Sequence, residues 1–201
     1  MKDLVLLVAD KNAQYALKGA LGRPQALGIR PIEFDFRVHP GRDGGTRKTG
    51  PDVLALERRV FRHGLLVLDF EGCGTDLPNA QALEAQLDGR LSAQWQEAAK
   101  AIVIEPELDV WIWGADNAIA AAIEWPAGPS VRDWLRGQGF TFEASGKPTR
   151  PKEALEAALR VPDLPRSSAL YQRIAEKISL RRCADEAFAR LLEQLIKWFP
   201  E

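Results

Sequence analysis

The chain has 201 residues, of which 46% are hydrophobic and 27% charged, and these are ordinary proportions for a globular domain with a substantial core. Its formal net charge is −1, so overall charge does not indicate a polyanionic partner. No stretch reaches the roughly 20 apolar residues that span a bilayer, and the first apolar run is too short for a signal peptide, so we expect a cytoplasmic protein without membrane contact.

The first part of the chain predicts a strand, a helix and a second strand. Residues 4–9 form an apolar run that ends at Asp10, as a buried strand would. Residues 11–21 have a helical period, with Asn12 as the expected N-cap. Residues 31–39 alternate between apolar and polar side chains, which predicts a half-exposed strand at a sheet edge.

Residues 40–50 break this periodicity with several glycines and bases. Such a segment could cradle a phosphate, but it matches neither the P-loop nor the dinucleotide-binding fingerprint. We therefore expect a mobile surface loop, followed by a helix from Pro51 to about residue 62.

The central stretch, residues 63–76, places two carboxylates at the end of an apolar run. Residues 65–68 have the character of a strand buried on both faces, as in a parallel sheet. Asp69 and Glu71 follow, and residues two apart on extended chain share a face, so both could reach one Mg2+. The alternative is structural, with Asp69 capping the turn at Gly72 and Glu71 solvated.

The next segments predict a helix at residues 79–91 and a third apolar strand at residues 101–105. That strand ends in Glu105, Pro106 and Glu107, because proline cannot continue the hydrogen-bonded ladder. Helices follow at residues 115–124 and 130–136. The tryptophans nearby are expected to pack in the core, with a base-stacking role as the alternative.

A change of composition at residues 137–149 precedes three further helices, at residues 151–160, 167–179 and 184–199. These elements together predict an α/β fold with a mainly parallel sheet flanked by helices. We expect an α/β core at residues 1–140 and a basic helical lobe at residues 141–201 that packs on it.

Charge is unevenly distributed along the chain. Residues 69–124 contain eleven acids and two bases, whereas residues 147–182 contain nine bases and four acids. An acidic centre beside a basic lobe suits a metal-dependent enzyme that acts on phosphates, although helix faces can accumulate such charge without function. The bases expected to contact nucleic acid are Lys152, Arg166, Arg173, Lys177, Arg181 and Arg182.

Several motifs resemble the Toprim domain, and more closely the Toprim-like proteins of bacterial anti-phage defence loci associated with methylation. They are LLVADKN (residues 6–12), LVLDFEG (66–72), VIEPELDVW (103–111), PKEAL (151–155) and RRC (181–183). In Toprim enzymes, an acid after the first strand is a general acid or base, and an Asp-x-Asp pair holds Mg2+. This chain departs from that pattern, with Asp10 displaced by one position and Asp69 paired with a longer Glu71.

The leading hypothesis is therefore a Mg2+-dependent nuclease, also served by Mn2+, within a defence system. The expected catalytic residues are Asp10 and Glu105, and the expected metal ligands are Asp69, Glu71 and Glu107. The expected partners are nucleic acid and other defence-system proteins, and a homo-oligomer remains open. The alternative, which the displaced Asp10 favours, is a non-catalytic Toprim-like scaffold or sensor subunit. Two cysteines without CxxC spacing and two histidines do not predict a zinc site, and an ATP-binding protein would need a P-loop.

Overall fold

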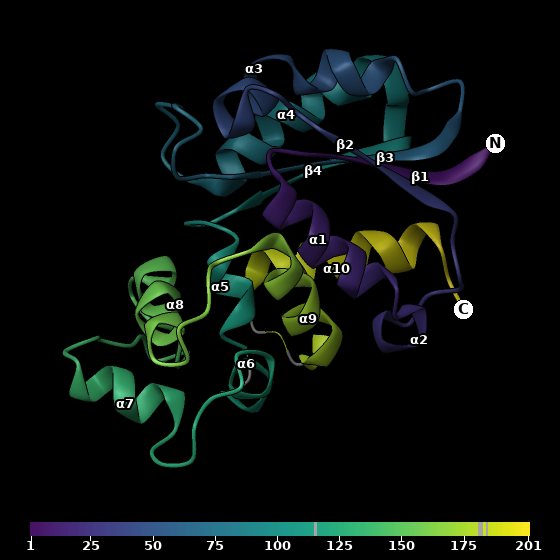
Figure 1. The fold of residues 1–201 in the computed structure, drawn as a ribbon. Coiled ribbons are helices and arrows are strands. Elements are labelled where there is room, and N and C mark those ends of the chain that lie inside the picture. The colour runs from purple at the N-terminus through teal and green to yellow at the C-terminus, as the bar shows by residue number, and fades with distance from the viewer. Residues whose placement is uncertain (115, 181–182, 184) are drawn as a thin grey trace.

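The computed structural model describes residues 1–114, 116–180, 183 and 185–201, and shows a four-stranded, all-parallel sheet flanked by helices (Figure 1). The strands are β1 (Lys2–Val8), β2 (Phe34–Val38), β3 (Phe61–Asp69) and β4 (Ala99–Ile104), in the spatial order β2-β1-β3-β4. The predicted α/β class is confirmed. The half-exposed strand β2 lies at the sheet edge, as its alternating pattern predicts.

All four carboxyl ends lie at one edge of the sheet, because every pair of neighbouring strands is parallel. The chain reverses its direction of winding between the two central strands, since β1 is followed by β2 on one side and β3 lies on the other. In open α/β sheets, ligands bind beyond the carboxyl ends of the strands at such a switch point.

Two helices, α3 (Arg42–Ala55) and α4 (Ala80–Trp95), cover the upper face of the sheet in Figure 1. Along β3, alternate side chains such as Leu66 and Leu68 point toward this layer. They pack in an apolar cluster with Leu83 and Leu87 of α4.

The opposite face of the sheet packs on α1 (Lys11–Leu21) and α10 (Glu186–Trp198), and α9 (Ser168–Lys177) packs against α1. The remaining helices are α2 (Pro24–Leu27), the 3-10 helix η1 (Gln96–Ala98), α5 (Asp109–Ile112), α6 (Asp116–Ala122), α7 (Val131–Gly137) and α8 (Pro151–Arg160). One apolar cluster on this side combines residues from before and after position 140. The domain boundary expected near that position stays a prediction. Among the described helices, none is both long enough and apolar enough to cross a bilayer.

The expectation of a mobile loop at residues 40–50 is wrong, because α3 begins at Arg42 and runs through Pro51 to Ala55. Two glycines of this helix allow it to pack closely against neighbouring side chains. A Cβ atom at Gly45 would lie 2.6 Å from the ring of His39, and one at Gly50 would lie 2.7 Å from a methyl carbon of Leu66. Glycine is needed at these positions so that the helix can approach the sheet, although it lowers helix propensity.

Candidate functional site

A polar cavity of about 540 Å³ lies beyond the carboxyl ends of the strands, at the switch point, and we call it the carboxyl-edge cavity. Its walls come from segments spread over most of the chain. The charged side chains that line it are Asp10, Lys11, Arg42, Asp43, Asp69, Glu107, Asp109, Lys152 and Arg166. Five carboxylates and four bases therefore share one cavity.

Asp69 is the last residue of β3, and its carboxylate is enclosed by protein although the residue as a whole is partly exposed. One carboxylate oxygen, Oδ1, accepts a hydrogen bond of 2.9 Å from the amide of Leu108. Burial, followed by the negative charge of Asp43, raises the pKa of Asp69 well above its ordinary value. The site thus holds a carboxylate whose charge is poorly compensated by the surrounding protein.

Asp10 follows β1 and caps α1, where its Oδ1 accepts a hydrogen bond of 2.9 Å from the amide of Ala13. This corrects the expectation that Asn12 is the cap, because Asn12 instead accepts a hydrogen bond of 2.9 Å from the hydroxyl of Ser168. The cap fixes the Asp10 carboxylate at the cavity wall.

Asp43 was not among the residues predicted for the site. It lies in the first turn of α3, and its Oδ1 accepts a hydrogen bond of 2.8 Å from the amide of Asp69. Burial raises its pKa, and the charge of Asp10 acts in the same direction. An acid that directly follows an apolar strand is the pattern that predicts Asp10 and Asp69. Asp43 does not fit this pattern, because it lies in a segment whose composition predicts a loop.

Asp109 is a second residue missed from the sequence, and it anchors a buried polar network. It is 2% exposed and accepts hydrogen bonds from the Tyr171 hydroxyl at 2.7 Å and from the Arg166 guanidinium at 2.8 Å. Arg166 also donates to the Tyr171 hydroxyl at 2.6 Å. Burial raises the pKa of both Asp109 and Tyr171. The network ties α5 to α9 and holds the Arg166 guanidinium at the cavity.

Glu107 and Lys152 both line the cavity, and their charges interact. Burial, together with the charge of Asp109, raises the pKa of Glu107 to about 7, while the charge of Lys152 lowers it. Lys152, in the first turn of α8, is half-buried. It makes no hydrogen bond, and no ion pair within 4 Å, with any residue that the structure describes. Its ammonium group is therefore available to a ligand.

Two predicted acids do not line this cavity. Strand β3 ends at Asp69 and the chain turns at Gly72, which has φ +80°, so the extended geometry expected to align Asp69 with Glu71 does not continue. Glu71 is exposed, and its charge contributes to the raised pKa of Glu107. Glu105 accepts a hydrogen bond of 3.1 Å from the amide of Ala80, at the start of α4.

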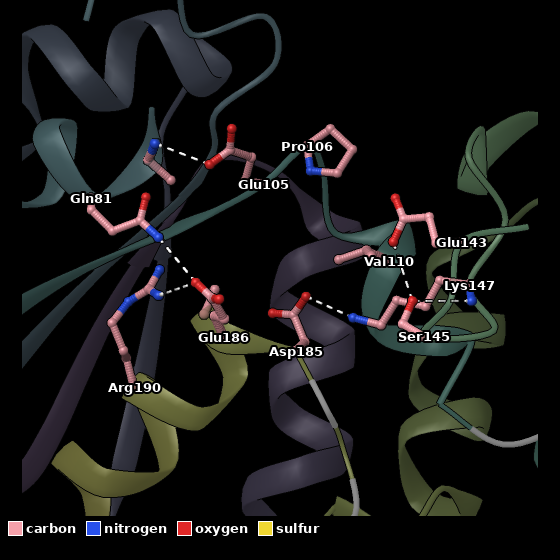
Figure 2. A pocket seen from close by; sticks show the side chains of 12 residues that line it. Gln81, Glu105, Pro106, Val110, Glu143, Ser145, Lys147, Asp185, Glu186 and Arg190 are labelled. Atoms are coloured by element: carbon pink, nitrogen blue, oxygen red, sulfur yellow. Dashed lines mark hydrogen bonds and ion pairs between the residues drawn. The ribbon is translucent and has the colours of Figure 1, made fainter. Parts of the chain in front are cut away.

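Glu105 instead lines a smaller cavity of about 260 Å³ between α4 and α10 (Figure 2). Its wall contains a buried ion pair of 2.9 Å between Lys147 and Asp185. Asp185 also accepts a hydrogen bond of 2.9 Å from the indole of Trp111, and it caps α10 through the amide of Phe188. These contacts assign Lys147 and Asp185 a structural role.

The residues predicted to contact nucleic acid do not form one group in the structure. Lys152 and Arg166 line the carboxyl-edge cavity, whereas Arg173 and Lys177 are exposed on α9. Arg181 and Arg182 lie outside the described residues.

No group of three or more His, Cys, Asp or Glu side chains is arranged to hold a metal ion in the part of the chain that the structure describes. The acids of the cavity nevertheless suit Mg2+, which prefers oxygen ligands. This ion is often bound by only one or two carboxylates and completes its shell with water and substrate phosphate. Three predicted site acids line this cavity: Asp69 and Glu107, expected as metal ligands, and Asp10, expected as a catalytic residue. Asp10 and Asp69 lie at the ends of the two central strands and could hold the ion there. Comparison with protein-family models, with curated proteins and with solved structures found no match to this chain.

Proposed function

We propose that the carboxyl-edge cavity is a Mg2+-dependent phosphodiesterase site that acts on nucleic acid. The observation that supports it most is the convergence of Asp10, Asp43 and Asp69, from three separate elements, in one cavity with Lys152 and Arg166. Crowded carboxylates favour a divalent cation, and the bases favour a phosphate. A phosphorylated substrate with Mg2+ would balance both kinds of charge.

Asp10 and Asp69 would hold the ion, and Asp43 would position Asp69 through its main-chain amide. Bound Mg2+ supplies neutralisation of the charge on the scissile phosphate. Lys152 would contact a non-bridging phosphate oxygen, since its ammonium lines the cavity and makes no hydrogen bond or ion pair within 4 Å with a described residue. Arg166 would add a guanidinium whose direction is set by Asp109.

Glu107 is the carboxyl group suited to proton transfer, because its pKa of about 7 allows it both to hold and to release a proton near neutral pH. It takes this role in place of Glu105, which lies in the other cavity. A place in bacterial anti-phage defence, alongside other defence proteins, is supported by the motif resemblance alone.

The test compares wild type with Asp69→Asn, which keeps a hydrogen-bond acceptor for Leu108 and removes the charge. The wild-type melting temperature should rise in Mg2+ or Mn2+, because an ion that binds only the native state stabilises it by about 2.7 kcal/mol at 100 times its Kd. Asp69→Asn should lose this response and the cleavage of labelled DNA or RNA. Its metal-free stability should be unchanged or higher, because a like-charge repulsion is removed.

Asp76→Asn is the matched control, since Asp76 is an exposed acid outside the cavity. It should keep both the metal response and the activity. A wild-type melting temperature that responds to neither metal would reject the enzyme and favour the scaffold or sensor subunit.

A further inference from the structure

Two helices, α1 and α9, pack side by side (Figure 1), and both carry exposed bases. Helix α1 contains no acid among its eleven residues, and α9 contains one, Glu176. The exposed bases are Lys11 and Lys18 on α1 and Arg173 and Lys177 on α9, and we call these four the α1–α9 surface. Residues 173 and 177 are four apart, so they share one face of their helix.

The two helices form a rigid pair. Near the start of both helices, the Ser168 hydroxyl donates a hydrogen bond to the side chain of Asn12. Near their ends, the Arg23 guanidinium, which follows α1, donates a hydrogen bond of 2.8 Å to the carbonyl of Ile178, which follows α9. The helices therefore run in the same direction. A Cβ atom at Gly19 would lie 2.8 Å from the main chain of α9, so the two backbones are in close contact. A surface built on such a pair is already ordered before it meets a ligand, which lowers the entropic cost of binding.

The cations of the α1–α9 surface are not paired with carboxylates of the described residues. None of the four forms an ion pair within 4 Å with a residue that the structure describes. Lys18 lies over the ring of Tyr15, at 5.8 Å from its centroid. The single acid, Glu176, accepts a hydrogen bond of 2.8 Å from Gln172. Four bases against one acid create a positive potential on this surface.

The α1–α9 surface begins at the carboxyl-edge cavity, because Lys11 belongs to both. Lys18 lies seven residues further along α1, a rise of about 10 Å. A ligand that reaches from the cavity to this base must carry negative charge at intervals along its length. A nucleic-acid strand has this property.

We infer that the α1–α9 surface binds the phosphate backbone of the strand whose phosphodiester group enters the cavity. The inference rests on the proposed function for the nature of the substrate. It adds a binding path outside the cavity and assigns Lys11 and Lys18 to it, beside Arg173 and Lys177.

The test measures binding of fluorescently labelled 15-nucleotide oligo-dT and oligo-U in EDTA, as a function of salt concentration. Each lost contact to a single strand lowers the slope of log K against log salt by about 0.7, so Lys18→Ala with Arg173→Ala should lower it by about 1.4. The affinity of this double variant at low salt should fall about tenfold. The matched control is Arg59→Ala with Arg62→Ala, which removes two exposed bases at the amino end of β3 and should leave the slope unchanged.

Glu176→Gln provides a test in the opposite direction. It removes the only acid of α9 and should strengthen binding by about threefold, because the positive potential is no longer reduced. A folding defect would weaken binding, so it cannot imitate this result.

Equal salt slopes for the two double variants, no gain from Glu176→Gln, or no binding by the wild type at low salt would each overturn the inference. Because these measurements contain no metal, they are independent of cleavage. A protein that binds through the α1–α9 surface but shows no metal response would retain the inference and lose the proposed enzyme. Metal-dependent cleavage by the wild type, with unaltered binding in the surface variants, would retain the proposed enzyme and overturn the inference.

Discussion

The main-chain amide of Asp69 donates a hydrogen bond of 2.8 Å to the carboxylate of Asp43, which lies 26 residues earlier in the chain. The pairing of β1 with β3 ends at Val8 and Val67, so the amide of Asp69 lies beyond this ladder and is satisfied by a side chain. The contact joins the first turn of α3 to the end of β3. It also brings two carboxyl groups together, which contributes to the raised pKa of Asp69.

Two substitutions of Asp43 distinguish the contribution of its hydrogen bond to stability from that of its charge. Asp43→Asn can still accept from the Asp69 amide and removes a like charge, so stability in EDTA should be unchanged or higher. Asp43→Ala should be less stable than Asp43→Asn by about 1–3 kcal/mol, because a partly buried amide loses its partner. Urea denaturation of both variants measures this difference. Equal stabilities would show that the hydrogen bond does not hold the end of β3.

Lys152→Ala should raise KM for a nucleic-acid substrate about tenfold, since a charge-assisted contact to phosphate contributes roughly 1.5–3 kcal/mol. Lys152→Arg should retain most of the affinity because it keeps the charge. Lys48→Ala, which removes an exposed lysine of α3, is the control and should behave as wild type. The Mg2+-induced rise in melting temperature should persist in all three variants. An unchanged KM in Lys152→Ala would remove this residue from the site.

Glu107 should make the stability of the metal-free protein depend on pH. Its pKa is about 7 in the native protein, compared with an ordinary value of 4.5 that applies to the unfolded chain. Between pH 4.5 and 7 the native state therefore binds this proton more strongly than the unfolded state does. Its contribution to stability is therefore fully present below pH 4.5 and is lost as pH rises through 7. In urea titrations in EDTA, wild type should gain stability relative to Glu107→Gln as pH falls from 7 to 4.5. A difference that stays constant across this range would contradict the raised pKa.

Alanine substitution at two adjacent glycines of α3 should change the stability of the protein in opposite directions. At Gly44 a Cβ atom would meet its nearest neighbour at 3.7 Å, so Gly44→Ala should stabilise the helix by up to about 1 kcal/mol. At Gly45 a Cβ atom would lie 2.6 Å from the His39 ring, and Gly45→Ala should destabilise the protein by about 1–3 kcal/mol. Thermal or urea melts of the two variants compare them directly. Equal effects would indicate that His39 moves aside freely.

Lys147→Met should destabilise the protein by about 3 kcal/mol, because Asp185 would remain as an unpaired buried charge. Adding Asp185→Asn should restore part of the loss, since the amide oxygen can still accept from Trp111 and carries no charge. The control is Lys197→Met, which breaks an exposed pair with Glu97 of 3.7 Å and should cost less than about 1 kcal/mol. Urea melts provide all three values. A double variant less stable than Lys147→Met would show that the carboxylate is not the source of the loss.

Local pattern predicted most of the elements that build the sheet. The apolar runs ending near Asp10, Asp69 and Glu105 are strands β1, β3 and β4, and the alternating segment is the edge strand β2. These assignments succeed because burial on one or both faces of a strand is recorded in neighbouring residues. The same reasoning failed at α3, where glycines that allow close packing have the composition of a loop.

The composition of the candidate site was decided by tertiary structure. The sequence placed Asp10 and Asp69 at strand ends, and parallel pairing brings both to one cavity. It could not place Asp43 there, because that depends on how closely α3 approaches the sheet. It could not exclude Glu71, because the point where β3 gives way to a turn depends on contacts with distant segments. Sequence spacing describes neighbours along the chain, whereas distances between segments far apart in sequence follow from strand register and packing.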